Sequence, residues 1–161
     1  MDIIIIGCSG RENAILNALS YETKNVLYGY IPHKQPQFCT ICKDAYIYKE
    51  FSIDDLLYYI KCNNIKYAIV LDQYYLEQGI IDSLLKADVY AIGPTYENAK
   101  IQYSKSFCRE FIRSIGCNDY NPDYIIVDNN TSYLIIYNFI KDHNNNIVVK
   151  PNGLYNGTGV K

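Results

Sequence analysis

The stretch DIIIIGCSGRENAILNAL, residues 2–19, places a run of four isoleucines directly before a glycine turn. A continuous β-branched run is typical of a strand buried on both faces of a parallel sheet. Gly7 and Gly10 lie in the turn, and residues 14–19 favour a helix. Such an arrangement holds phosphates, because the first helical N–H groups are unpaired and the helix dipole favours an anion. The G-x-x-G spacing differs from the G-x-G-x-x-G of dinucleotide sites, so a tight turn without a ligand remains the alternative.

Beyond this stretch, strands and helices are predicted to alternate as far as residue 92. Strands are predicted at residues 25–30, 44–48, 66–71 and 88–92. A polar loop separates the first two of them, and helices are predicted to begin after Ser52 and to cover residues 80–85. The alternation predicts an α/β fold with right-handed βαβ units and a parallel sheet. Binding sites in such sheets lie at the carboxyl ends of the strands. Three turns are predicted there, at residues 7–11, 71–73 and 93–95.

The pattern changes after Gly93 and Pro94. A short helix is predicted at residues 97–101, and a second one from about Ser104 to a stop at Gly116. Strands at residues 124–127 and 147–150 are predicted to flank a helix that contains residues 134–140. This succession predicts the beginning of a second unit, with the boundary near residues 94–103.

The closing stretch IVVKPNGLYNGTGVK, residues 147–161, combines a lysine with three glycines. Lys150 follows a β-branched run, and Gly153, Gly157 and Gly159 come next. Glycines so spaced let the backbone point N–H groups at an anion, and the lysine adds a positive charge. The stretch therefore indicates phosphate binding, with a glycine-rich surface turn or frayed tail as the alternative.

Composition excludes several classes of protein. The 161 residues are 49% hydrophobic and 20% charged, which is typical of a globular protein, and the net charge of −2 does not favour nucleic-acid binding. The longest apolar run, Ile3 to Ile6, is too short to span a membrane, and the first residues do not resemble a signal peptide, so a cytoplasmic location is predicted. The one C-x-x-C pair, Cys39 and Cys42, lacks the second pair that a zinc site requires, and no metal ligand is assigned.

Three stretches, in this order, resemble the glycinamide ribonucleotide synthetase (phosphoribosylamine–glycine ligase) family of the ATP-grasp superfamily. Residues 5–14, IIGCSGRENA, are similar to the family's opening IG-x-GGREHA. Residues 92–95, IGPT, followed by YSKSF at 103–107, are similar to FGPT…GSKAF. Residues 148–160, VVKPNGLYNGTGV, are similar to VVKADGLAAGKGV. The resemblance covers the whole chain but only the N-terminal part of the family pattern.

The resemblance implies a fold and a reaction. Residues 1–100 would form the N-terminal pre-ATP-grasp domain, which is Rossmann-like, and residues 101–161 the incomplete beginning of an ATP-grasp domain. Family members make glycinamide ribonucleotide in purine synthesis. ATP phosphorylates the carboxylate of glycine, and the amine of phosphoribosylamine then attacks the acyl phosphate. ATP and Mg²⁺ are therefore the implied cofactors, and a small phosphoribosyl compound is the implied substrate.

The resemblance also implies site residues. Gly7, Gly10 and Arg11 would bind the phosphate of the phosphoribosyl substrate, with a solvated residue at a helix start as the less favoured alternative for Arg11. The implied nucleotide-binding residues are Lys105, Lys150, Gly153, Gly157 and Gly159. Lysines at such positions would spread charge over the transferring oxygens. A surface helix lysine is the alternative for Lys105, and no catalytic residue is assigned.

The departures from the family pattern lead to a second hypothesis. LDQYYL, residues 71–76, replaces the family's GPE-x-PL turn, and Asn13, Asn152 and Thr158 replace a histidine, an acidic residue and a lysine. We therefore expect a truncated or degenerate N-terminal part that is inactive alone and does not bind ATP and Mg²⁺ productively. The alternative is a non-catalytic α/β module for a phosphorylated metabolite or a protein partner. Apolar surface on a half-built second unit also leaves homo-oligomer formation open.

Overall fold

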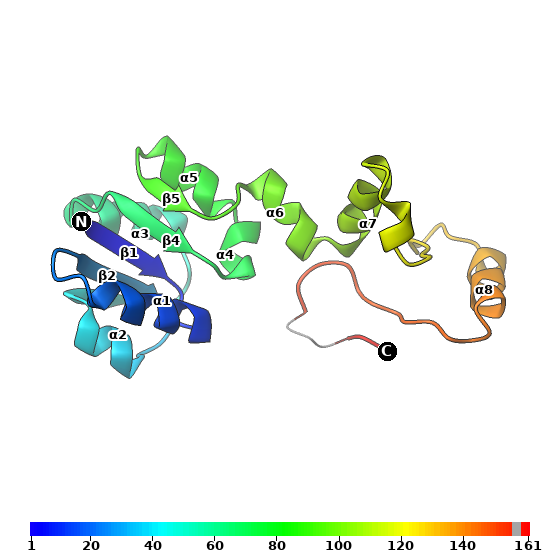
Figure 1. Ribbon diagram of the computed structural model, residues 1–161, viewed down its shortest axis with the longest axis horizontal. Helices are drawn as coiled ribbons and strands as arrows, with labels where there is room; N and C mark the ends of the chain where they lie inside the picture. The colour runs from blue at the N-terminus through cyan, green and yellow to red at the C-terminus, as the bar shows by residue number, and fades with distance from the viewer. Residues whose placement is uncertain (156–158) are drawn as a thin grey trace. The chain divides into compact units, whose positions relative to one another are not determined.

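The structure is a computed structural model that describes residues 1–155 and 159–161 (Figure 1). The chain forms two compact units, Met1–Ala99 and Lys100–Lys161. The helix α6, Tyr96–Tyr103, crosses from the first unit into the second.

The first unit is an α/β domain built on one parallel sheet. Its five strands have the order β3-β2-β1-β4-β5, and every neighbouring pair is parallel. This confirms the predicted fold class. The elements in chain order are β1 (Asp2–Ile6), α1 (Gly10–Ser20), β2 (Val26–Ile31), α2 (Pro36–Ile41), β3 (Asp44–Ile47), α3 (Ile53–Cys62), β4 (Tyr67–Val70), α4 (Gln73–Glu77), α5 (Ile80–Lys86) and β5 (Tyr90–Ile92).

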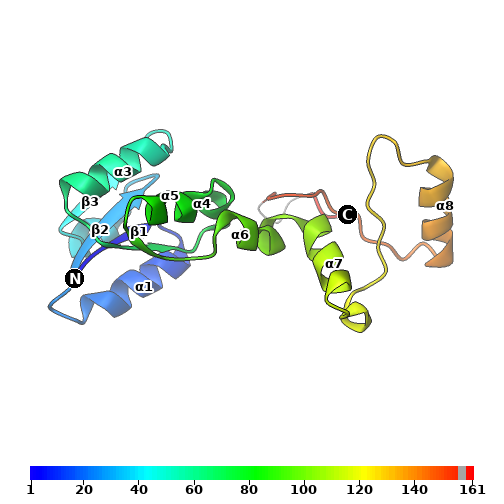
Figure 2. The same cartoon turned by 90° about the horizontal axis from the view of Figure 1, so that it is seen from above.

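Helices cover both faces of the sheet, with α1 and α3 on opposite sides (Figure 2). The central strand β1 is therefore buried on both faces, which explains its run of isoleucines. On the α1 face, Leu16 of α1 and Phe38 of α2 pack in one core with Ile3 and Ile5. Gly29 of β2 allows this packing, because a Cβ atom there would lie 2.7 Å from the ring of Phe38.

Two short helices replace segments that were predicted as a loop and a turn. The side chain of Gln35 starts α2 by accepting the N–H groups of Gln37 and Phe38, at 2.6 and 3.2 Å. Asp72 starts α4 in the same way, because its Oδ1 accepts the N–H of Tyr74 at 2.9 Å. Both segments are short, so apolar periodicity gave no signal for them.

The second unit contains α7 (Lys105–Ser114), a 3₁₀ turn (Asn118–Tyr120) and α8 (Tyr133–Asp142). The predicted strands at residues 124–127 and 147–150 are wrong, because neither segment is assigned as a strand. A β-branched run needs a neighbouring strand to pair with, and among the described residues Val149 forms backbone hydrogen bonds with Lys161 alone, at 2.7 and 3.0 Å. Among the described residues from 104 onward, none is buried.

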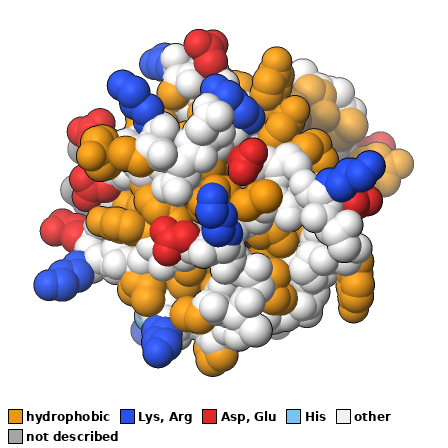
Figure 3. All heavy atoms as spheres, turned by 90° about the vertical axis from the view of Figure 1, so that its left-hand side faces the viewer, with side chains coloured by type: hydrophobic (Ala, Val, Ile, Leu, Met, Phe, Trp, Pro, Cys, Tyr) orange, Lys and Arg blue, Asp and Glu red, His pale blue; other side chains and the backbone are white. Residues whose placement is uncertain are grey.

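The surface mixes charges of both signs. Figure 3 shows lysine and arginine side chains interspersed with acidic and hydrophobic ones on the face in view. None of the helices in the described part of the chain has the length and hydropathy that a membrane crossing requires.

Candidate functional site

The carboxyl ends of the strands in the first unit gather several polar side chains. Cys8 follows β1, His33 follows β2, Tyr48 follows β3, and Asp72 and Tyr75 follow β4. Because parallel strands end at the same edge of a sheet, these residues belong to one region. The turn between β1 and α1 lies at this edge, and it holds all three residues predicted to bind the phosphate.

Some backbone N–H groups of the β1–α1 turn already donate hydrogen bonds within the protein. Gly7 has a φ of +97°, a conformation that favours glycine, and its N–H donates to the carbonyl of Tyr30 at 3.0 Å. The Ser9 N–H donates to Oε2 of Glu12 at 2.8 Å. The N–H groups of Gly10 and Arg11 have no acceptor among the described residues, and both residues are exposed. The open donors for an anion therefore lie on the outer side of the turn.

Glu12 is a functional candidate that the sequence reasoning missed. It is the one buried charged side chain among the described residues, with no exposed surface. Oε2 accepts both the N–H and the hydroxyl of Ser9, whereas Oε1 has no hydrogen-bond partner among the described residues. The S-x-x-E pattern of Ser9 and Glu12 before an apolar run could have identified this helix start. The buried Glu12 carboxylate thus restrains the turn through its two hydrogen bonds to Ser9.

Asn13 and Cys8 connect the turn to the loop after β2. The Asn13 amide donates to the carbonyls of Cys8 and Ser9 at 3.1 and 2.9 Å, and its Oδ1 accepts from Gln35 at 2.7 Å. Cys8 Sγ lies 3.5 Å from Nε2 of His33. Burial, followed by the charge of Glu12, raises the pKa of the Cys8 thiol, so this thiol is held in its neutral form.

Tyr75 closes the inner side of the turn. A Cβ atom on Gly7 would lie 3.1 Å from the ring of Tyr75, which is 3% exposed. The Tyr75 and Tyr48 hydroxyls share a buried hydrogen bond of 2.6 Å. Burial raises the pKa of Tyr75, and the bond to Tyr48 raises it further. The ring of Tyr75 therefore occupies the space beside Gly7.

Tyr48 and Tyr75 belong to a larger group of aromatic rings on the α3 face of the sheet. Neighbouring rings in this group have centroids 4.9 to 6.4 Å apart. Its members are Tyr28, Tyr30, Tyr46, Tyr48, Phe51, Tyr59, Tyr74 and Tyr75. Within this group, Tyr28, Tyr30, Tyr48, Tyr59 and Tyr75 are buried core residues, whereas Tyr46 and Tyr74 are exposed.

In the second unit, the structure brings Lys105 and Gly153 together. Lys105 Nζ donates to the carbonyl of Gly153 at 2.7 Å. Oδ1 of Asn152 accepts the N–H of Ser106 at 3.2 Å, next to the Ser104 hydroxyl at 3.4 Å. The N-terminus of α7 is therefore tied to the glycine stretch.

The other predicted nucleotide-binding residues make no comparable contact with Lys105 among the described residues. Lys150 is exposed and has no partner among the described residues. Gly159 has a φ of +77° and packs against Pro151, while Gly157 lies outside the described residues. In residues 1–155 and 159–161, no three His, Cys, Asp or Glu side chains are grouped closely enough to hold a metal ion. Lys105 at the start of α7 and Lys150 before the glycine stretch are thus the cationic groups of the predicted set that could contact an anionic cofactor.

Comparison with known sequences identifies similar proteins. Residues 1–102 match the sequence model of the family described as phosphoribosylglycinamide synthetase, N domain. The phosphoribosylamine–glycine ligase of Methanocorpusculum labreanum is 34% identical over 161 residues, covering 100% of this chain and 36% of the relative. The enzyme of the same description from Pyrococcus horikoshii is 30% identical with the same coverage. The chain therefore spans about 36% of the length of these curated relatives.

Solved structures share the fold at low sequence identity. The D-alanine–D-alanine ligase of Bacillus anthracis aligns with a TM-score of 0.59 and 18% identity, over 99% of this chain and 47% of that chain. A protein of Mycobacterium tuberculosis described as glycinamide-RNase-transformylase T aligns with a TM-score of 0.61 and 9% identity, over 98% and 45%. These likenesses establish the architecture alone.

Proposed function

The chain belongs to the phosphoribosylglycinamide synthetase N-domain family, and from this premise we propose that it serves the ATP-dependent joining of glycine to phosphoribosylamine. In this proposal the first unit holds the phosphoribosyl substrate at the carboxyl edge of its sheet. The second unit supplies part of the nucleotide site. The observation that carries the proposal is the β1–α1 turn, where Gly10 and Arg11 offer free N–H groups beside the Arg11 side chain.

The proposed contacts at the turn follow from its open donors. A phosphate monoester carries a negative charge that the N-terminus of α1 and the Arg11 guanidinium both stabilise. Glu12 takes no part in the contact, because its side chain is fully buried beneath the turn, with Oε2 bonded to Ser9. Its role is to hold the turn in the conformation that exposes Gly10 and Arg11.

The proposed nucleotide contacts belong to Lys105, Lys150 and the glycine stretch. Bound ATP would supply the phosphoryl group that activates the glycine carboxylate, with Mg²⁺ neutralising its charge. The hydrogen bond from Lys105 Nζ to the carbonyl of Gly153 supports this assignment, because it brings the ammonium group beside the glycine stretch. Lys150 would approach from the same stretch. The prediction that these 161 residues alone do not catalyse the ligation stays a prediction, as does the cytoplasmic location.

Binding of ribose 5-phosphate to the full chain tests the proposal. We expect saturable binding by calorimetry and a rise in Tm, because a ligand of the folded state stabilises it. Arg11→Ala should weaken binding by about tenfold or more, the value of a charge-assisted hydrogen bond. Arg113→Ala is the matched control and should bind normally, since Arg113 pairs with Glu110 in the second unit. An unchanged affinity in Arg11→Ala would remove the turn from the proposal.

A second function, a non-catalytic module for a phosphorylated metabolite, is favoured by Tyr75. Its ring occupies the space beside Gly7, so that only the outer donors of the turn remain open. A module that holds only the phosphate should bind inorganic phosphate and ribose 5-phosphate with equal affinity. A substrate site should prefer ribose 5-phosphate, because the sugar adds contacts.

A further inference from the structure

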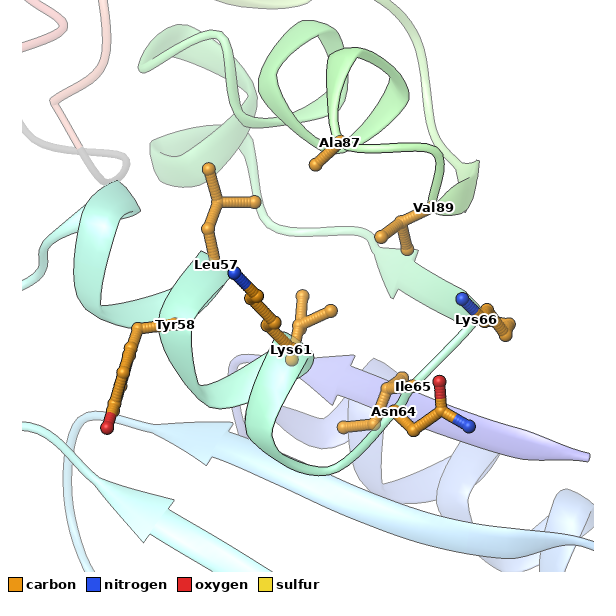
Figure 4. A pocket seen from close by; sticks show the side chains of 9 residues that line it. Leu57, Tyr58, Lys61, Asn64, Ile65, Lys66, Ala87 and Val89 are labelled. Carbon is orange, nitrogen blue, oxygen red and sulfur yellow. The ribbon is translucent and has the colours of Figure 1, made fainter.

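A hollow of about 340 Å³ lies at the amino end of the sheet, where α3 and α5 end and β4 begins. Figure 4 shows the side chains around it. The volume is at the low end of the range for small-molecule sites. Its lining consists of Leu57, Tyr58, Ile60, Lys61, Asn64, Ile65, Lys66, Ala87 and Val89.

The floor of the hollow is apolar and fixed by the core. Ile60, Ile65 and Val89 belong to the buried residues, with exposed fractions of 4%, 2% and 4%. Leu57 and Tyr58 continue this apolar surface along α3, and the Tyr58 side chain is exposed. A ligand with an apolar body would therefore meet a preformed surface, and it would remove hydrophobic area from water.

The rim of the hollow is positively charged. Lys61 and Lys66 are exposed; Lys61 projects from α3 and Lys66 lies just before β4 (Figure 4). Neither ammonium group pairs with a carboxylate among the described residues, and the lining contains no acidic side chain. Two unpaired cations above an apolar floor complement a molecule that is apolar at one end and negatively charged at the other.

We propose that this hollow binds a small organic anion with an apolar body, such as an aryl-alkyl carboxylate or an aryl phosphate. The apolar body would rest on Ile60, Ile65 and Val89, and the anionic group would lie between Lys61 and Lys66. The site is separate from the β1–α1 turn, which lies at the carboxyl edge of the same sheet. Four residues of β4 separate the two edges, a distance of about 13 Å at the rise of a strand.

Titration of the full chain with 3-phenylpropionate, followed by amide chemical shifts in NMR spectra, tests the proposal. We expect saturable shifts that cluster at residues 57–66 and 87–89. The neutral alcohol 3-phenylpropan-1-ol should bind roughly fivefold more weakly, because the two exposed charge pairs together contribute about 1 kcal/mol. The double variant Lys61→Gln/Lys66→Gln should lose this preference for the acid. Phenyl phosphate, titrated in parallel, decides which anionic group is favoured.

The matched control is Lys34→Gln/Lys49→Gln, which removes two exposed lysines from another part of the first unit. It should retain the affinity and the preference for the acid. Ala87→Tyr, which places a ring at the mouth of the hollow, should reduce the affinity for both probes. Equal binding of acid and alcohol by the unaltered chain, shifts outside the hollow, or no saturable shift would each overturn the proposal.

Discussion

Glu12 shows how one buried carboxylate shapes the β1–α1 turn. Replacing Glu12 by Ala removes the acceptor of the Ser9 N–H and empties a fully buried side-chain position. We expect this variant to lose about 1–3 kcal/mol of unfolding free energy, through the lost hydrogen bond and the lost packing. Urea denaturation followed by circular dichroism measures the loss.

Two further variants test whether hydrogen bonding is the cause. Glu12→Gln keeps an amide oxygen for Ser9, so it should lose less stability than Glu12→Ala. Glu50→Ala removes an exposed carboxylate and should be neutral. Equal stability of Glu12→Ala and the unaltered chain would contradict the role assigned to this side chain.

The buried tyrosines predict a loss of stability at alkaline pH. Burial, with the charge of Asp55 as a smaller cause, raises the pKa of Tyr30 to about 12, and burial raises the pKa of Tyr59 and Tyr75. At neutral pH these phenols are protonated in both states. As the pH rises further, the unfolded chain loses protons that the folded chain keeps, so the unfolding free energy decreases.

Tm measured between neutral pH and pH 11 checks this dependence. The Tm of the unaltered chain should decrease from about pH 10 upward. Tyr75→Phe should make the decrease shallower, because one buried ionisable group is gone. Tyr21→Phe should leave it unchanged, because Tyr21 is 87% exposed. Identical slopes for the two variants would assign the decrease to other groups.

At the scale of elements, the sequence predicted those whose signal is local. The isoleucines of β1 and the apolar spacing in α3 are properties of single segments, and both elements form as predicted. The short helices α2 and α4 depend on capping by Gln35 and Asp72, which periodicity does not detect. Whether residues 124–127 and 147–150 form strands depends on a neighbouring strand with which they could pair. The residues of each segment alone therefore could not predict the outcome.

The contact between Asn152 and α7 predicts the effect of an acidic residue at that position. Asn152 Oδ1 accepts the N–H of Ser106 in the first turn of α7. Asn152→Asp would bring a full negative charge to this helix N-terminus, worth about 0.3–1 kcal/mol. The Ser106 amide should therefore exchange more slowly with deuterium, and in Asn152→Ala it should exchange faster.

The exchange rate of the Ser106 amide, measured by NMR, tests this prediction. Asn138→Asp adds the same charge to the exposed surface of α8 and should leave Ser106 unaffected. If Asn152→Ala and the unaltered chain exchange alike at Ser106, the link between α7 and the glycine stretch does not restrain this helix.

At the scale of the whole chain, the three motifs identified the family, and the family match over residues 1–102 confirms it. The residues in those motifs could be named from the sequence, but their accessibility could not. Gly7 donates its N–H to Tyr30 and packs against Tyr75, contacts between segments that are distant in the sequence. Whether the named residues bind the phosphate and the nucleotide stays a prediction, as does the division into a pre-ATP-grasp and an ATP-grasp domain.

The distribution of buried residues predicts that the first unit folds without the second. Apart from Tyr103, every buried hydrophobic residue among those described lies in residues 1–99. A fragment that ends after Tyr103 should therefore unfold cooperatively at nearly the same urea concentration as the full chain. Its m-value should also be similar, because m follows the surface exposed on unfolding. In the full chain, amides of β1, β2 and β4 should be protected from exchange, and those of residues 105–155 should exchange fast.

A shorter fragment that ends after Gln78 is the control for the stability of fragment 1–103. It lacks α5, and with it Ile80, Ile81 and Leu84, whose exposed fractions are 0%, 2% and 0%. Loss of these side chains uncovers one face of the sheet, so this fragment should be unfolded in the absence of denaturant. A stable fragment 1–78 would show that α5 and β5 are dispensable. A much lower urea midpoint for fragment 1–103 than for the full chain would show that residues 104–161 stabilise the first unit, despite having no buried side chain among those described.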